Sequence, residues 1–171
     1  MQSFAVKALW LQVKQQRRVP REFFVDRVLA MNDEKSAPSN QNRSSETSQK
    51  AADAMRQSVL VVDDEENFLT LLKWFLSQRG YDVSTAVSAD DALEMVQQQN
   101  FDIALLDIKL GSSNGLTLLE EVTARSPRLK VIMMTAYPTV SSLKQAFSRG
   151  AMRYLTKPVD LQELTEALRL L

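Results

Sequence analysis

Short apolar runs alternate with amphipathic segments from Ser58 to the end of the chain. The run Ser58–Val62 (SVLVV) is apolar almost throughout, as in a strand that is buried on both faces. The segment from about Glu66 to Gln78 then places three leucines on one helical face, and Gly80 follows as a helix stop. The alternation continues with predicted strands at Tyr81–Ala86, Phe101–Leu106, Val131–Met134 and Met152–Leu155, and predicted helices at Ala89–Gln98, Leu116–Ala124, Val140–Phe147 and from Leu161 onward.

Five strands, each followed by a helix, indicate an α/β fold with a five-stranded parallel sheet covered on both faces. Right-handed crossovers make this a doubly wound three-layer sandwich of the flavodoxin-like kind. In such folds a ligand binds beyond the carboxyl ends of the strands, where the strand order reverses. Functional residues are therefore expected directly after the carboxyl end of each strand.

The first third of the chain follows a different pattern. Residues 1–31 carry apolar side chains at helix-like spacing and are predicted to form a helical extension. Residues 32–57 are mostly polar, with too little apolar surface to offset the entropy of ordering, so a disordered linker is predicted there. Residues 58–171 form the predicted folded domain. Met55 would be a natural start for that domain, so the role of residues 1–57 stays open.

Composition narrows the chemistry that is available. The chain has no Cys and no His, which excludes disulfides, thiolate metal sites, imidazole bases and a phosphohistidine relay within the chain. Residues 58–171 carry 15 acidic against 11 basic side chains, which argues against direct nucleic-acid binding by that part. No apolar run nears the roughly 18–20 residues of a membrane span, and no secretory signal is evident, so a cytoplasmic location is expected.

Five polar side chains follow four of the predicted strands. Asp63 and Asp64 end the first strand, Asp107 the third and Thr135 the fourth, and Lys157 follows the fifth. The topology gathers all of them at one edge of the sheet. Each residue alone has a simpler interpretation, such as a strand-end turn, a loop entry or a helix cap. Their joint placement favours a functional site.

The chemistry of this set is consistent with phosphoryl transfer. Three neighbouring carboxylates repel one another, and a divalent cation removes that cost; oxygen ligands without His or Cys favour Mg²⁺. An ionised carboxylate can attack phosphorus to give an aspartyl-phosphate. Lys157 and the cation would offset charge on the phosphoryl oxygens, and Thr135 can donate a hydrogen bond to one of them.

The motifs VVDDE, LLD, MTA and KP, in this order, resemble the receiver domain of two-component response regulators, and the likeness runs from Ser58 to Leu171. It implies that Asp63 and Asp64 hold Mg²⁺ and that Asp107 is the phosphoacceptor and a Mg²⁺ ligand. Thr135 becomes the switch hydroxyl and Lys157 the lysine that acts with Asp107 in phosphotransfer.

Two further roles come from the same resemblance. Tyr154 stands where the family places its rotating switch aromatic, although half-buried packing is an alternative reading for it. The backbone carbonyl of Lys109 stands where the family has another Mg²⁺ ligand. The stretch from Met134 to Leu164 is most similar to receivers of enhancer-binding transcription activators.

This chain departs from the family pattern at three positions. Gly111 replaces the usual Pro four residues after the phosphoacceptor, so the loop Gly111–Gly115 is expected to be more mobile. Val159 stands where an aromatic is common. Tyr137, two residues after Thr135, is expected to obstruct the attacking water and slow the hydrolysis of a phospho-form.

The resemblance predicts a signalling module, with no enzyme activity beyond self-catalysed phosphotransfer and dephosphorylation. A sensor histidine kinase or a phosphotransfer protein would phosphorylate Asp107, and a switched surface would then contact a downstream protein or a second copy of the chain, regulating transcription indirectly. No output domain follows Leu171 in this sequence, so a stand-alone receiver and a fragment of a longer regulator both fit. The rival interpretations are an Asp-based phosphohydrolase and a scaffold that is never phosphorylated; a flavin-binding module is disfavoured because the first loop has no phosphate cradle.

Overall fold

The computed structural model describes residues 56–171, so the predicted extension 1–31 and nearly all of the predicted linker 32–57 lie outside the described residues. The described part forms one compact unit. Its strands are β1 (Ser58–Val62), β2 (Asp82–Ala86), β3 (Ile103–Asp107), β4 (Lys109–Leu110), β5 (Ser113–Asn114), β6 (Lys130–Thr135) and β7 (Ala151–Thr156). Its helices are α4 (Glu66–Ser77), α5 (Ala89–Gln98), α6 (Gly115–Arg125), α7 (Val140–Ser148) and α8 (Leu161–Arg169).

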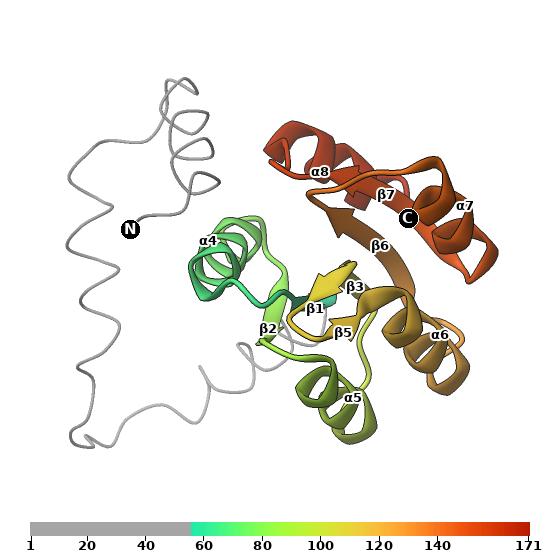
Figure 1. Ribbon diagram of the computed structural model, residues 1–171. Helices are drawn as coiled ribbons and strands as arrows, with labels where there is room; N and C mark the ends of the chain where they lie inside the picture. The colour runs from blue at the N-terminus through green and yellow to red at the C-terminus, as the bar shows by residue number, and fades with distance from the viewer. Residues whose placement is uncertain (1–55) are drawn as a thin grey trace, which may run out of the picture. The chain divides into compact units, whose positions relative to one another are not determined.

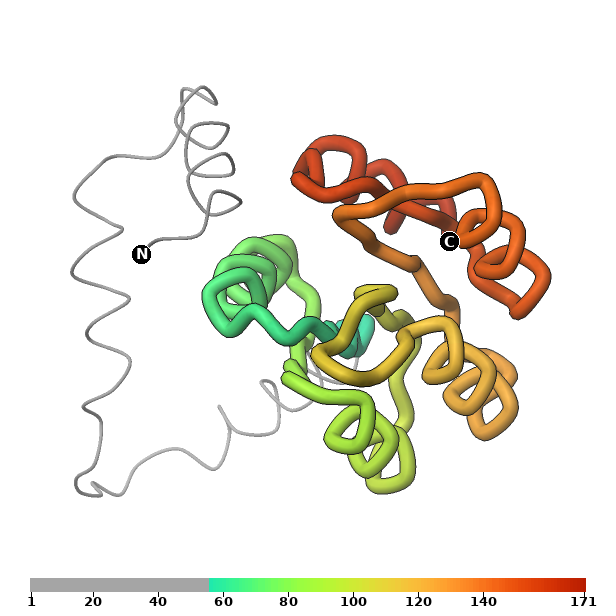
Figure 2. The backbone as a smooth tube through the Cα atoms, in the orientation of Figure 1, coloured from blue at the N-terminus to red at the C-terminus, as the bar shows by residue number. Residues whose placement is uncertain are grey.

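Five strands form a sheet in the order β2-β1-β3-β6-β7, and every neighbouring pair is parallel. Helices α4 and α8 cover one face of this sheet, and α5, α6 and α7 cover the other (Figure 1). The path of the backbone through these alternating strands and helices can be followed in Figure 2. This is the doubly wound, flavodoxin-like sandwich that the sequence predicts, and the prediction is confirmed.

The central strands are apolar because both of their faces are buried. Alternate side chains of β1, β3 and β6 pack in one core with α5, α6 and Ala146 of α7. The intervening side chains of the same strands point to the opposite face, toward the layer of α4 and α8. Leu60, Leu105 and Ile132 are completely buried, and burial of one such side chain contributes roughly 1.5–3 kcal/mol. Within residues 56–171, no helix is both long enough and apolar enough to cross a membrane.

Four of the five described helices begin at a side-chain cap. Ser88 caps α5, Asn114 caps α6, Thr139 caps α7 in a capping box, and Asp160 caps α8, each by accepting hydrogen bonds from backbone N–H groups of the first turn. Helix α4 differs, because its N-cap Glu65 makes no side-chain cap hydrogen bond. The loop before α4 therefore has carboxylates that are not used to start the helix.

A short antiparallel hairpin joins β3 to α6. Its strands β4 and β5 pair Lys109 with Asn114 and Leu110 with Ser113, and Gly111 in the turn has a φ of +56°. The sequence predicts only a loop here, because two-residue polar strands have no detectable periodicity. The fold does not test the expectation that this loop is more mobile. The pairing of β4 with β5 does give the loop backbone contacts that the sequence pattern does not indicate.

Gly115 marks a close approach between the start of α6 and the end of β3. A Cβ atom at this position would overlap the carbonyl oxygen of Asp107 and lie 2.9 Å from its carbonyl carbon and 3.0 Å from Cα of Ile108. The Gly115 N–H also donates to the carbonyl oxygen of Ile108 at 2.7 Å. Because the obstacles are backbone atoms, they cannot move aside without moving Asp107.

We expect Gly115→Ala to lower the free energy of unfolding by about 3 kcal/mol, at the upper end of what overpacking usually costs. Urea denaturation followed by circular dichroism measures the change. Gly80→Asn is the control: Gly80 has a φ of +86°, but a Cβ atom added there would have nothing within 4 Å, and Asn tolerates this conformation at a cost of less than about 1 kcal/mol. Equal losses in the two variants would contradict the close-packing explanation.

Candidate functional site

The register of the parallel strands brings the predicted site residues to one rim. Val62 of β1 is level with Leu106 of β3, so Asp63 and Asp107 follow side by side at the ends of neighbouring strands. On the next strands, Thr135 is level with Thr156, and Lys157 follows directly. The backbone N–H of Lys157 also donates to the Thr135 carbonyl oxygen at 2.7 Å.

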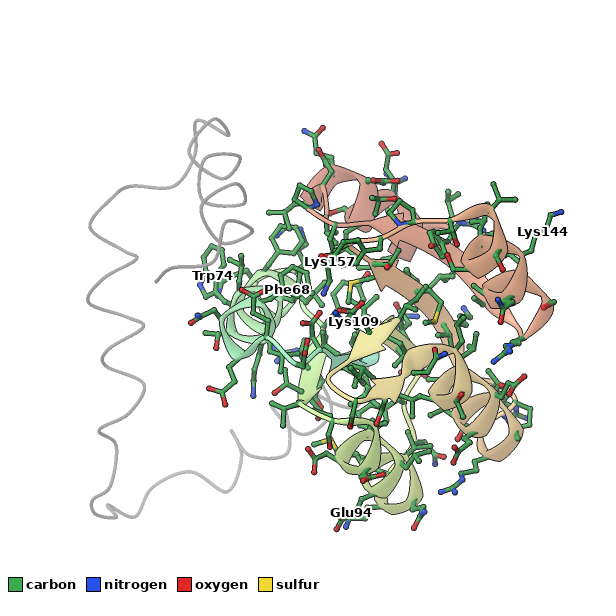
Figure 3. The ribbon with its side chains drawn as sticks, in the orientation of Figure 1. Phe68, Trp74, Glu94, Lys109, Lys144 and Lys157 are labelled. Carbon is green, nitrogen blue, oxygen red and sulfur yellow. The ribbon has the colours of Figure 1, made fainter. Side chains whose placement is uncertain are left out.

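Lys157 lies between the two buried carboxylates. Its ammonium donates to Oδ2 of Asp63 at 2.6 Å and to Oδ2 of Asp107 at 2.5 Å. Asp63 is fully buried and Asp107 is 5% exposed. The ammonium also lies 4.8 Å from the ring centroid of Phe68, which α4 supplies (Figure 3). This cation–π contact gives the charged lysine a favourable neighbour in addition to the carboxylates.

Burial and charge oppose each other in this group of side chains. Burial raises the pKa of the Asp63 carboxyl to about 6, although Lys157 and the N–H of Glu65 pull it down. Burial alone would lower the pKa of Lys157, but the carboxylates of Asp63 and Asp107 outweigh that effect and raise it. Lys157 therefore stays charged at neutral pH, while its burial makes the carboxyl of Asp63 harder to ionise, as its raised pKa shows.

Backbone N–H groups hold each of the three carboxylates. The N–H of Glu65 donates to Oδ1 of Asp63 at 3.1 Å, and the N–H of Lys109 donates to Oδ1 of Asp107 at 3.2 Å. The third acid, Asp64, is exposed, and its Oδ2 accepts a hydrogen bond at 3.2 Å from an N–H in the β4–β5 hairpin. The loop after β1 and the β4–β5 hairpin therefore hold the three carboxylates between them.

Asp63, Asp64 and Asp107 form a triad that can hold a metal ion. Each offers one carboxylate oxygen, and the three oxygens lie within 4.8 Å of one another. The ligand set contains only oxygen, which suits a hard divalent cation. One acid is exposed and the other two are buried, so a cation at this point would be open to solvent on one side.

Asp64, Glu65 and Glu66 could instead serve only to cap the start of α4 and to match its dipole, but the hydrogen bonds give little support to that interpretation. Glu65 occupies the N-cap of α4 without a side-chain cap bond, and its Oε1 is buried with no hydrogen-bond partner among the described residues. Asp64 bonds to the hairpin instead of the helix. Only Glu66, in the first turn, has the place expected of a charge that complements the helix dipole.

Thr135 ends β6 at the same edge of the sheet, and Tyr137 follows it two residues later. Thr135 is 2% exposed, and its hydroxyl oxygen accepts a hydrogen bond from the N–H of Tyr137 at 3.1 Å. The Tyr137 side chain is 73% exposed, and its ring centroid is 5.8 Å from the ammonium of Lys109. The ring therefore lies near the end of the Lys109 side chain.

Tyr154 is tied to the start of α7 and makes no hydrogen bond to Thr135 in this structure. Its hydroxyl is 2.8 Å from Oγ of Ser142, which belongs to the capping box formed with Thr139. Its ring also packs against the core, so the packing interpretation of this residue holds as well. Any rotation of Tyr154 would break a bond to the helix cap.

Sequence reasoning missed two residues that shape the site, Phe68 and Ser142. Helical spacing assigns Phe68 to the ordinary core positions of its helix, and the position of Lys157 over its ring depends on tertiary packing. A signal for Ser142 does exist, since Thr139 and Ser142 have the spacing of a capping box with Ser at the position usually held by Glu or Gln. The same spacing gives no indication of the bond to Tyr154.

The raised pKa of Asp63 predicts a measurable pH dependence of stability. A carboxyl of ordinary pKa near 3.9 in the unfolded chain binds its proton more tightly once folded, so its contribution to stability is present below pH 4 and is lost as the pH rises through about 6. In metal-free buffer at pH 7, we expect Asp63→Asn to be more stable than the natural chain by about 1–3 kcal/mol. At pH 4 the difference should vanish.

Urea unfolding with EDTA at several pH values between 4 and 7 makes this comparison. Asp82→Asn removes an exposed carboxylate of β2 and is the matched control, for which we expect no such dependence. A variant at Asp63 that is less stable than the natural chain at pH 7 would show that the pairing with Lys157 outweighs burial.

Comparison with known proteins agrees with this geometry. The chain matches the response regulator receiver domain over residues 59–169. It is 39% identical over 110 residues to the transcriptional regulatory protein ZraR of Escherichia coli (strain K12), covering 64% of this chain and 25% of ZraR. It is also 39% identical over 119 residues to the response regulator protein PilR of Pseudomonas aeruginosa, covering 67% of this chain and 27% of PilR. The chain therefore spans about a quarter of the length of these relatives.

Solved structures show the same fold. A CheY-like receiver domain protein from Methanospirillum hungatei JF-1 matches with a TM-score of 0.65 and 33% identity, over 67% of this chain and 92% of that one. A response regulator from Burkholderia pseudomallei, solved with a phosphorylated aspartic acid and a calcium ion, matches with a TM-score of 0.63 and 32% identity, over 66% of each chain. The resemblance to receivers of enhancer-binding regulators is also confirmed, because ZraR and PilR are of that group. The chain belongs to the response regulator receiver family, whose members are signalling modules rather than enzymes in the usual sense, and it carries the acidic triad typical of a phosphoacceptor site.

Proposed function

We propose that residues 58–171 work as a phospho-accepting switch in which Asp107 takes a phosphoryl group from a histidine kinase or a phosphotransfer protein. Receiver domains as a class pair with histidine kinases, and phosphorelay signalling follows from the family. The observation that carries the proposal is the ammonium of Lys157 bonded to Oδ2 of Asp107 within a triad of acids. This arrangement places a carboxylate nucleophile next to a positive charge.

The chemistry is an in-line displacement at phosphorus. A carboxylate oxygen of Asp107 forms the new bond, while the bond from phosphorus to the donor atom breaks and its electron pair leaves with the donor. Lys157 moves from the carboxylate to a phosphoryl oxygen and offsets the charge there. Mg²⁺, held by Asp63, Asp64, Asp107 and the backbone carbonyl of Lys109, would supply further neutralisation of the transferring group.

Thr135 and Tyr154 are the proposed switch residues. The Thr135 hydroxyl accepts from the N–H of Tyr137 and keeps its own proton to donate to a phosphoryl oxygen. Tyr154 would then turn inward and release Ser142 at the start of α7. One charge-assisted hydrogen bond supplies roughly 1.5–3 kcal/mol, less than the about 5.5 kcal/mol needed for a complete change of state. Binding of a partner supplies the rest.

The switched surface lies on α7, β7 and α8. Helix α7 exposes Val140, Leu143 and Phe147 at positions three and seven apart, and Met152 of β7 is exposed as well. A downstream protein, or a second copy of the chain after phosphorylation, would bind there, and any effect on transcription would be indirect. We propose a cytoplasmic location and no direct contact with nucleic acid or membrane.

A small phosphodonor tests the proposal directly. Incubation with acetyl phosphate and Mg²⁺ should place an acid-resistant, base-labile phosphoryl group on Asp107, detected by intact mass and peptide mapping. Asp107→Asn should abolish the label, and the control Asp82→Asn in β2 should retain it. Sustained phosphate release without a labelled intermediate would indicate a phosphohydrolase. No label under any donor would indicate a scaffold that is never phosphorylated.

Tyr137 is expected to lengthen the life of the phospho-form. Its exposed ring lies near the ammonium of Lys109, which is two residues after Asp107, and we expect it to block the path of an attacking water. Tyr137→Ala should therefore speed the loss of phosphate by up to roughly tenfold, or about 1.4 kcal/mol in the barrier. Tyr137→Phe keeps the ring and should decay like the natural chain. Equal decay rates for Ala and Phe, measured from the mass-labelled fraction over time, would contradict this role.

A further inference from the structure

The hairpin after Asp107 is bonded to the loop after β1 through one backbone hydrogen bond. The N–H of Gly111 donates to Oδ2 of Asp64 at 3.2 Å, across 47 positions of sequence. Gly111 is in the turn between β4 and β5, where Lys109 pairs with Asn114 and holds the turn in place. An ordered backbone group therefore contacts an acid of the triad.

Asp64 depends more on such a contact than the other two acids do. Asp63 and Asp107 are buried and share the ammonium of Lys157. Asp64 is exposed, so its side chain would otherwise sample several rotamers in solvent. A hydrogen bond from an N–H to an ionised carboxylate is stronger than one between neutral groups, and here it engages Oδ2 and leaves Oδ1 for a ligand.

The residue type at position 111 makes this contact possible. Gly111 has a φ of +56°, which glycine adopts freely and proline cannot, since its ring fixes φ near −65°. Proline also has no N–H to donate. Space is not the reason for glycine, because a Cβ at this position would meet nothing within 4 Å. Position 111 therefore requires a residue that has a backbone N–H and can adopt a positive φ.

We propose that Gly111 is a positioning residue for the divalent cation: its amide holds the Asp64 carboxylate in the triad and thereby raises the affinity of the site for Mg²⁺. The inference rests on the proposed binding of Mg²⁺ by the triad. It assigns to the hairpin a part in metal binding, and it gives a physical consequence to the replacement of the usual proline in this chain.

Magnesium titration followed by amide NMR tests the proposal without any phosphotransfer. Gly111→Pro removes the donor and the left-handed conformation, and we expect its dissociation constant for Mg²⁺ to rise by roughly tenfold. Gly111→Asn keeps the N–H and tolerates a positive φ, so its affinity should stay close to that of the natural chain. Dispersed amide spectra at the temperature of the titration establish that both variants are folded.

A double-mutant cycle shows whether Gly111 acts through Asp64. In the Asp64→Asn background the carboxylate is gone, so adding Gly111→Pro should have no further effect on Mg²⁺ affinity. A similar rise in the dissociation constant in both backgrounds would overturn the inference. A natural chain that shows no response to Mg²⁺ would overturn the metal proposal as well, so the two failures are distinguishable.

Metal-free hydrogen exchange tests the contact itself and needs no substitution at position 111. The Gly111 amide should exchange more slowly in the natural chain than in Asp64→Asn, because only the natural chain offers an ionised acceptor. The Leu116 amide, which donates to Asn114 Oδ1 at the start of α6, is the internal reference and should be unaffected. Equal exchange of the Gly111 amide in the two proteins would overturn the proposal even if Gly111→Pro failed to fold.

Discussion

The ammonium of Lys157, bonded at once to Asp63 and Asp107, is the interaction on which the site depends. Two buried carboxylates at neighbouring strand ends would repel each other, and removal of the lysine would leave both of them buried without a positive charge between them. The lysine offsets that repulsion, and the ring of Phe68 gives its charge further support. A positive charge is thereby held beside the buried carboxylate of Asp107.

The topology of the sheet brings Lys157, Asp63 and Asp107 together. Parallel strands place all their carboxyl ends on one rim, and the register between β1, β3, β6 and β7 sets the spacing of the side chains at those ends. The close approach at Gly115 locks the hairpin against the backbone of Asp107. The same loops therefore determine the geometry of the acids and the start of the next helix, so stability and chemistry are coupled.

The sheet and the location of the site can be predicted from the sequence, because they depend on local periodicity and on topology. The alternation of apolar runs and amphipathic segments predicts the sheet, and strand ends predict where Asp107 and Lys157 lie. The β4–β5 hairpin is not predictable, since strands of two residues carry no periodic signal. The bond from Ser142 to Tyr154 and the placement of Phe68 beside Lys157 depend on how helices pack on the sheet, which spacing along the chain does not specify.

The most direct measurement is a crystal structure of the chain grown with Mg²⁺ and beryllofluoride, a mimic of the phosphoryl group. We expect beryllium bonded to a carboxylate oxygen of Asp107, with the ammonium of Lys157 moved onto a fluorine and the cation among the three acids. Beryllium absent from Asp107, or Lys157 turned away from the fluorines, would contradict the claim that this lysine and this carboxylate work as one phosphoryl-accepting unit.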